Sequence, residues 1–296
     1  MLYRATHITR YVYEQPVSQC LTEARLIPRS FDGQTLRESR IAVEPEPAVS
    51  GRRRDYFGNE VATFEVFQRH DRLTATATSL VEVVPRTASD LPPAPWDDAR
   101  RLLVEHPDDA SLAAYEFTFG SSFVTTNTTL AEYGRPTFTP GRPMAGAVLE
   151  LAARIHAEFR YQPKSTSIDV PLTKVLKQRE GVCQDFAHLM IGVLRSFGLA
   201  ARYVSGYLRS RKEYLGAEAS HAWVSVYIPG YGWLDIDPTN NVIPSGAHIT
   251  LAWGRDYGDV SPVKGITLGG GGQTVQVEVR VEPVESGGTQ APRQAT

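Results

Sequence analysis

Apolar and polar positions alternate over the first 85 residues with the two-residue period that is typical of β-strands. The alternation is clearest in YRATHITRYVY and returns in SRIAVEP, EVATFEVFQ and RLTATATSLVEVVP. The turn-forming stretches RSFDGQ, EPEP and DYFGNE separate these strands. Several short strands at this spacing predict an antiparallel β-sandwich over residues 1–85.

Beyond the sandwich the period changes to that of helices. The segment 85–100, PRTASDLPPAPWDDAR, is rich in proline and aspartate and indicates a linker, so we expect a linker and short helices over 86–142. Apolar residues then recur at helical spacing after Pro143, which suits a first helical turn. DVPLTKVLKQRE predicts a shorter helix. A third helix is predicted from Cys183, with Gly198 as its stop.

Strand patterns return after the third helix in AARYVSGYL, HAWVSVYIP and GWLDIDP. A glycine run at 269–272 precedes TVQVEVRVEP, a last alternating strand. The chain is therefore predicted to be an α+β protein, with a mixed core over 143–284 after the sandwich and the linker. Residues 285–296 are expected to be a disordered tail.

Composition narrows the classes of protein. The 296 residues carry a formal net charge of −2 without a basic tail or stripe, which argues against a nucleic-acid partner. Neither an 18-residue apolar run nor a signal-like N-terminus is present, so we expect no membrane partner. Two cysteines in a chain of this length predict a reducing, cytoplasmic location. Of the two cysteines, Cys20 is expected to be buried and structural. The oligomeric state stays open.

Cys183 begins a predicted helix directly after Gly181 and Val182. Free N–H groups and the positive end of the helix dipole point at a side chain in this position, which favours the reactive thiolate. A small apolar residue that opens a core helix would give the same pattern. Cys183 alone therefore leaves both interpretations open.

The stretch SHAWVSVYIPGYGWLDIDPTN supplies two polar partners. His221 begins one predicted strand and Asp237 ends the next. A three-residue turn that pairs Tyr227 with Tyr231 would place His221 opposite Asp237, whereas a two-residue turn would put them on opposite faces. A carboxylate that holds one tautomer of an imidazole allows that ring to take a proton from a thiol.

GVCQDFAH together with SHAWVSVYIPGYGWLDIDPTN resembles the bacterial transglutaminase-like superfamily. The first 85 residues resemble the β-rich N-terminal domain of a bacterial subfamily, through HITRYVY, RLIPR and DYFGNE, and GRDYGDVSPVKGI resembles its C-terminal signature. The resemblance of the core runs from about residue 144 to 242. It implies a papain-like Cys-His-Asp core, with a helix that carries the cysteine on an antiparallel sheet, after a β-sandwich-like domain.

The resemblance implies roles position by position. Cys183 would be the nucleophile, His221 the general base and then the general acid, and Asp237 the residue that orients the imidazole. Asp235, on the same face, is the alternative for orientation. The backbone N–H of Cys183 would bind the oxyanion, and Gln184 is a candidate for the second donor.

Other neighbours have structural interpretations beside functional ones. Asp185 lies in the first helical turn, where it complements the dipole. His188 should point away from the thiol and is expected to support the site or the core. Trp223 and Trp233 are candidates for lining a cleft, although core packing is the simpler role. Asp256 borders the site only by resemblance.

No metal or cofactor is expected. The chain lacks an EF-hand pattern, and its cysteines and histidines lack zinc-ligand spacing. The predicted reaction is cysteine-dependent acyl transfer on a peptide or protein amide through a thioester, most simply hydrolysis by a peptidase or amidase. A protein-glutamine transglutaminase that forms isopeptide bonds and a non-catalytic binding module are the alternatives.

Overall fold

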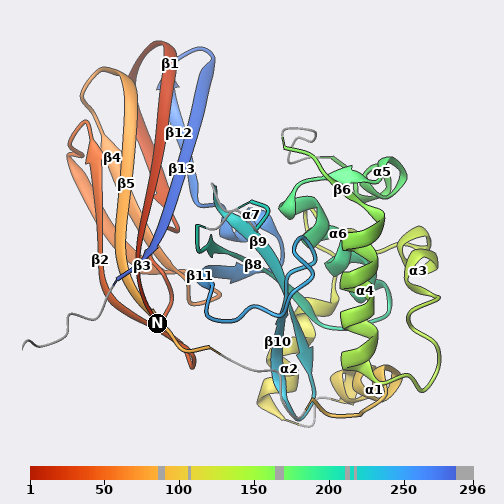
Figure 1. Cartoon of the computed structure of the whole chain (residues 1–296). Helices are drawn as coiled ribbons and strands as arrows, with labels where there is room; N and C mark the ends of the chain where they lie inside the picture. The colour runs from red at the N-terminus through yellow and green to blue at the C-terminus, as the bar shows by residue number, and fades with distance from the viewer. Residues whose placement is uncertain (86–90, 106–107, 164–169, 211–213, 217–218, 285–296) are drawn as a thin grey trace, which may run out of the picture.

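A computed structural model describes the chain in two parts, a tall β-rich unit and a mixed core (Figure 1). The residues that it describes are 1–85, 91–105, 108–163, 170–210, 214–216 and 219–284. The predicted tail, 285–296, lies outside them. The α+β class and the β-rich start of the chain agree with the prediction.

The N-terminal β unit is built around one long strand. Its first five strands are β1 (Leu2–Ala24), β2 (Gln34–Glu44), β3 (Val49–Arg54), β4 (Glu60–Val66) and β5 (His70–Val83). The first half of β1 pairs with β5, and its second half pairs with β4. β2 extends the β5 side and β3 the β4 side, so β1 contributes to two layers. Apolar side chains, among them Cys20, Phe64 and Leu73, fill the space between them.

The last two strands of the chain complete this unit. They are β12 (Val263–Gly269) and β13 (Gln273–Pro283). β13 pairs with the first half of β1 and β12 with the second half. The predicted core range 143–284 is therefore wrong at its C-terminal end, because residues 263–283 belong to the N-terminal sheet. The sequence pattern identified β13 but not β12 or β3.

A four-stranded antiparallel sheet in the order β10-β9-β8-β11 forms the floor of the core. Its strands are β8 (Ala201–Leu208), β9 (His221–Ile228), β10 (Gly232–Ile236) and β11 (His248–Gly254). Three of them coincide with predicted strands. β11 was not predicted because HITLAWG is buried at nearly every position and does not alternate.

Helices cover one face of this sheet (Figure 1). The longer ones are α1 (Trp96–Glu105), α4 (Met144–Glu158) and α6 (Cys183–Ser196), and the shorter ones are α2 (Asp109–Tyr115), η1 (Glu116–Thr118), α3 (Thr128–Gly134), α5 (Leu172–Gln178) and α7 (Tyr257–Val260). Two short parallel strands, β6 (Arg160–Tyr161) and β7 (Glu180–Gly181), join the ends of α4 and α5. The predicted linker supplies α1 to α3, and their buried Trp96 and Leu130 belong to the core cluster.

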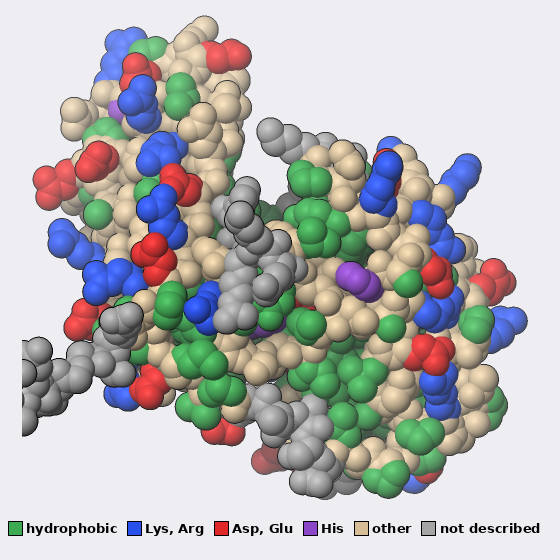
Figure 2. Space-filling model, viewed as in Figure 1, with side chains coloured by type: hydrophobic (Ala, Val, Ile, Leu, Met, Phe, Trp, Pro, Cys, Tyr) green, Lys and Arg blue, Asp and Glu red, His purple; other side chains and the backbone are tan. Residues whose placement is uncertain are grey.

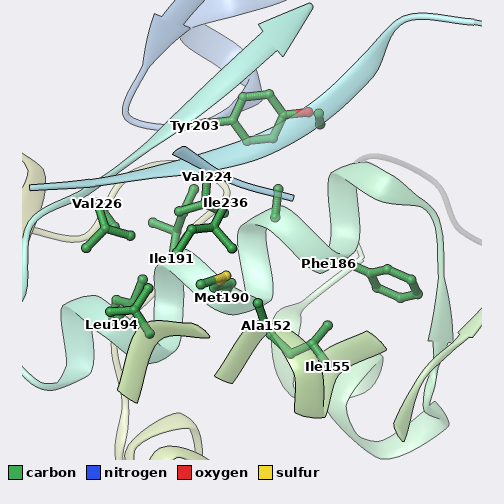
Figure 3. Packing of buried hydrophobic residues seen from close by; sticks show 14 of the residues in the cluster. Ala152, Ile155, Phe186, Met190, Ile191, Leu194, Tyr203, Val224, Val226 and Ile236 are labelled. Carbon is green, nitrogen blue, oxygen red and sulfur yellow. The ribbon is translucent and has the colours of Figure 1, made fainter. Parts of the chain in front are cut away.

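Helix α6 is the centre of the core. It lies between the sheet and α4, and Met190 and Ile191 fill the space between Val224 on the sheet and Ala152 on α4 (Figure 3). Because every residue from Asp185 to Arg195 is buried, the apolar packing around the helix fixes the position of its N-terminus.

Two amide side chains join the β unit to the core. Strand β11 is an edge strand of its sheet, and Gln34 exchanges two hydrogen bonds with the backbone of Thr250, at 2.8 Å each. Asn59 does the same with Trp253, at 2.9 and 3.0 Å. Arg29 stacks on the ring of Trp253, 3.6 Å from its centre. The motifs RLIPR and DYFGNE thus contribute Arg29 and Asn59 to this interface, and the open edge of the sheet is covered.

In the described part of the chain, none of the helices combines the length and the apolar character that a membrane crossing requires. The predicted cytoplasmic location stays a prediction.

Candidate active site

Cys183 is the first residue of α6, so its side chain stands where the helix leaves backbone N–H groups unpaired. Asp185 takes one of the local donors, because its Oδ2 accepts the backbone N–H of Val182 at 2.8 Å. This close approach requires Gly181, where a Cβ would lie 2.8 Å from that oxygen. Asp185 is therefore an anchor of the helix start. Only 9% of the Cys183 surface is exposed.

His221 and Asp237 lie together in the floor of the site. Nε2 of His221 is 2.9 Å from Oδ2 of Asp237, and both side chains are fully buried. The predicted pairing of Tyr227 with Tyr231 is wrong, because Tyr227 pairs with Trp233 across a three-residue turn. The turn is nevertheless odd in length, which keeps His221 and Asp237 on one face.

Both carboxylate oxygens of Asp237 accept hydrogen bonds from neighbouring groups. Its Oδ1 accepts the backbone N–H groups of Thr239 and Asn240, at 2.9 and 3.1 Å, and its Oδ2 accepts the Asn240 amide at 2.8 Å. Burial would raise the pKa of Asp237. The bonds from His221 and then His248 outweigh burial and hold the pKa well below its usual range. The carboxylate is therefore charged and cannot turn freely.

The imidazole of His221 is under two opposing influences. Burial alone would lower its pKa, but Asp237 and then Cys183 outweigh burial and raise the pKa of His221 to about 10. Gly216, with a φ of +83°, stands over Nδ1, and a Cβ there would lie 2.9 Å from that atom. The ring is thus an imidazolium at neutral pH. Asp237 lies at its Nε2, and the Cys183 thiol is close enough to raise the pKa of the ring.

His188 is buried one turn beyond Cys183 on α6 and contacts Tyr203 of β8. Its Nε2 accepts the backbone N–H of Tyr257 at 3.1 Å, and its ring stacks on Phe123. Burial lowers the pKa of His188 to about 4, so the ring is a neutral acceptor. Asp256 caps α7 through the N–H of Gly258 and also accepts the N–H of Phe123. These two predicted neighbours hold the loop around α7.

The remaining predicted residues separate into two groups. Gln184 is half-buried beside Cys183, and Asp235 faces Ser225 across the hairpin, so both stay predictions as site residues. Trp223 is fully buried and packs against His248, which fits the simpler role of core packing, and its place in a cleft stays a prediction. Trp233 packs edge-on against Phe117, at the other end of the hairpin from His221.

His248 is a member of the cluster that the sequence pattern did not indicate. It is the first residue of β11, and its Nε2 lies 3.2 Å from Oδ2 of Asp237. A short apolar run bounded by a glycine, HITLAWG, is consistent with a fully buried strand, and this signal would have placed a histidine at its start.

The three side chains also satisfy the spacing of a metal site. The ligand atoms of His221, Asp237 and His248 lie within 4.8 Å of one another. A metal ion would need a lone pair at each Nε2. Both Nε2 atoms lie at hydrogen-bond distance from Oδ2, where each N–H donates a hydrogen bond to the carboxylate. The donor set therefore fits a hydrogen-bonded cluster better than a metal centre.

Two family models match the chain. The bacterial transglutaminase-like N-terminal region matches residues 3–82, and the transglutaminase-like superfamily matches residues 132–238. The second match contains Cys183, His221 and Asp237, and the first covers the part of the N-terminal β unit that precedes the core.

Relatives and solved structures agree with these matches. An uncharacterised protein from Mycobacterium tuberculosis is 38% identical, over 96% of this chain and 93% of its own. A protein-glutamine gamma-glutamyltransferase from Pseudomonas aeruginosa is 30% identical over 145 residues, which are 40% of this chain and 22% of its own. The crystal structure of a candidate cysteine protease from Cytophaga hutchinsonii superposes with a TM-score of 0.76 at 20% identity, covering 95% of this chain and 90% of its own.

A helix that carries a cysteine, packed on an antiparallel sheet that carries a histidine and an aspartate, defines the papain-like class of folds. The chain belongs to the transglutaminase-like superfamily, within the group that carries the bacterial transglutaminase-like N-terminal region. Membership supports a cysteine-dependent enzyme.

Proposed function

We propose that the protein catalyses acyl transfer from an amide through a thioester on Cys183, with hydrolysis as the main outcome. One observation carries the proposal: Asp237 holds the His221 imidazolium at Nε2, and both Asp237 and Cys183 raise the pKa of this ring. A charged imidazole beside a thiol at a helix start is the arrangement that activates a cysteine nucleophile.

The first step forms the thioester. The proton of the Cys183 thiol resides on His221 when the sulfur attacks the carbonyl carbon, and the N–H groups at the start of α6 stabilise the oxyanion that develops. His221 gives its proton to the nitrogen, the C–N bond breaks, and an amine leaves. Asp237 keeps the ring in one orientation and stabilises its positive charge throughout.

The second step releases the acyl group. His221 takes a proton from water, the oxygen attacks the thioester carbon, the C–S bond breaks, and a carboxylic acid leaves. If a primary amine attacks instead of water, the product is a new amide. The match to a named protein-glutamine gamma-glutamyltransferase favours this second outcome as the alternative, with a glutamine side chain as the acyl donor.

One experiment separates the outcomes. The protein is incubated with a mixture of unfolded proteins, with and without a labelled primary amine, and mass spectrometry follows new termini and incorporated label. New termini that persist in the presence of amine support hydrolysis, whereas label on glutamine supports transglutamination. The Cys183→Ala variant is the control. Equal product from this variant would rule out the thioester, and no product from either would favour a binding module.

A further inference from the structure

The Asp237 carboxylate binds a second imidazole besides that of His221. His248 Nε2 lies 3.2 Å from Oδ2, the same oxygen that lies 2.9 Å from His221 Nε2. The side chain of His248 is 4% exposed and that of Asp237 is fully buried. Two buried rings from different strands therefore share one oxygen.

The protonation state of His248 follows from its surroundings. Burial lowers its pKa, although Asp237 opposes this, so the ring is neutral. A neutral imidazole beside a carboxylate that is already ionised must place its one proton on Nε2 to make the contact. The groups that face the ring are Asp237, His221, Asp235 and Tyr214, and Trp223 packs edge-on against it. His248 is thus a neutral donor held in a fixed position.

The donor is positioned from the N-terminal β unit. Thr250, two residues beyond His248 on β11, exchanges two 2.8 Å hydrogen bonds with the side-chain amide of Gln34. Gln34 is itself buried and also donates to the backbone oxygen of Arg29 at 2.7 Å. A displacement of β11 would break this contact, so Gln34 fixes the start of the strand.

We infer that His248 is a positioning residue, which fixes Oδ2 of Asp237 for His221, and that Gln34 brings the N-terminal β unit into the site by holding β11. This inference rests on the proposed function. Without the His248 proton, Oδ2 loses one of its three donors and the carboxylate gains freedom to turn about its Oδ1 contacts. The His221 ring then loses its fixed orientation toward the thiol.

The first test compares two substitutions of His248. His248→Leu removes the donor and keeps an apolar side chain, and His248→Gln keeps an N–H donor. We expect kcat/KM to fall about tenfold to a hundredfold in His248→Leu and to recover to within about threefold of wild type in His248→Gln. His70→Leu is the matched control, because it removes a buried imidazole of the β unit that bonds to a backbone oxygen.

A second readout reports on the thiol itself. The rate of Cys183 alkylation by iodoacetamide is measured from pH 5.5 to 9 in each variant, and far-ultraviolet circular dichroism verifies folding. We expect the acid-side rate to fall in His248→Leu and to be restored in His248→Gln. Equal rates in wild type and His248→Leu would overturn the inference, and so would equal losses in the two variants, which would indicate packing alone.

Metal addition tests the competing role of the cluster. We expect neither EDTA nor Zn²⁺ at equimolar concentration to increase turnover. If EDTA abolished activity and Zn²⁺ restored it, His248 would be a metal ligand and not a hydrogen-bond donor to Asp237. Failure of the proposed function is a separate outcome, because Cys183→Ala would then turn over substrate as the wild type does.

Gln34 has a matched control in Asn59, which bonds to the same strand five residues beyond His248. Gln34→Ala and Asn59→Ala each remove two backbone contacts of β11, so we expect similar losses of unfolding free energy. Only Gln34→Ala should also reduce kcat/KM, by about three- to tenfold. Equal activities of the two variants would contradict a role for Gln34 in the site.

Discussion

The two free cysteines lie in two regions that bury them almost equally and surround them differently. Cys20 is 1% exposed near the C-terminal end of β1, where Val66 of β4 and Thr267 of β12 are its strand partners. Burial raises the pKa of its thiol. Cys183 is 9% exposed and stands at a helix start beside a charged imidazole.

The comparison shows that burial alone does not decide what a thiol can do. In the β unit, burial opposes the charged form and supplies no partner that outweighs it. In the core, β9 brings a cation to the sulfur, and the loop after β10 brings the carboxylate that holds this cation. Five measurements would test this difference between the two thiols.

The largest expected effect is on turnover. Replacement of Cys183 by alanine removes the sulfur that forms the thioester, and we expect kcat to fall by at least ~10³-fold. Cys20→Ala should leave kcat within about twofold of wild type. Substrate turnover by the two purified variants measures this, and a large loss in Cys20→Ala would end the contrast.

Alkylation at low pH should separate the two thiols directly. The pKa of His221 is raised to about 10, so its positive charge is present beside Cys183 at pH 6. We expect iodoacetamide to label Cys183 about 10²-fold faster than Cys20 in the native protein at pH 6. Peptide mapping after timed labelling gives both rates. Similar rates would contradict an activating effect of the charged His221 on Cys183.

Gly216 should be intolerant of a side chain. A Cβ would lie 2.9 Å from His221 Nδ1, and the φ of +83° is strained for alanine. We expect Gly216→Ala to lower kcat about tenfold to a hundredfold, since the ring must shift from the thiol. Gly230→Ala, at φ +79° with open space around it, controls for backbone strain. Equal kcat in the two variants would argue against contact with His221.

The stability of the core should depend on pH through His221. Its pKa in the folded protein, about 10, is above the ordinary 6.5. The contact with Asp237 therefore stabilises the fold fully below pH 6.5 and loses this effect as the pH rises through 10. Relative to His221→Gln, we expect urea unfolding to show a wild-type advantage that shrinks by up to about 1.4 kcal/mol per pH unit. An advantage that grows toward pH 9 would reverse the assignment.

The smallest effect concerns Cys20. A hydroxyl at this buried position loses more hydration than a thiol does, and the Val66 backbone and the Thr22 side chain replace only part of it. We therefore expect Cys20→Ser to reduce the unfolding free energy by about 1–2 kcal/mol. The kcat of the folded variant should not change. Urea unfolding and turnover together measure this, and a stability equal to that of wild type would show that the site is polar.

The sequence predicted the parts of the fold where a period is strong. Apolar residues at helical spacing predicted α6, and the β-branched and aromatic residues of HAWVSVYI predicted β9, although both elements are buried on all sides. An odd turn was sufficient to place His221 and Asp237 on the same face. The register itself could not be predicted, because it depends on how Tyr227 packs beside Trp233. The predicted roles of Cys183, His221 and Asp237 come from residue types at element ends and from family resemblance, and they stay predictions.

Contacts distant in sequence were not accessible from a single chain. β11 lacks alternation because it is buried throughout, so His248 had no element to be placed on. The pairing of β12 and β13 with β1 depends on three-dimensional closure, and no local pattern encodes it. Gln34 and Asn59 look like turn residues in the sequence, and their role emerges only once the edge of β11 lies beside them.

The pairing of β1 with β12 and β13 has a consequence for biosynthesis. The ribosome synthesises β1 first and its two partner strands only after the whole core. One edge of β1 therefore stays unpaired during most of translation. The core can fold in the meantime, since its helices and its sheet lie between these strands in the chain. We therefore expect the β unit to close last, and nascent chains that stop before residue 263 to expose a pairing edge that attracts chaperones.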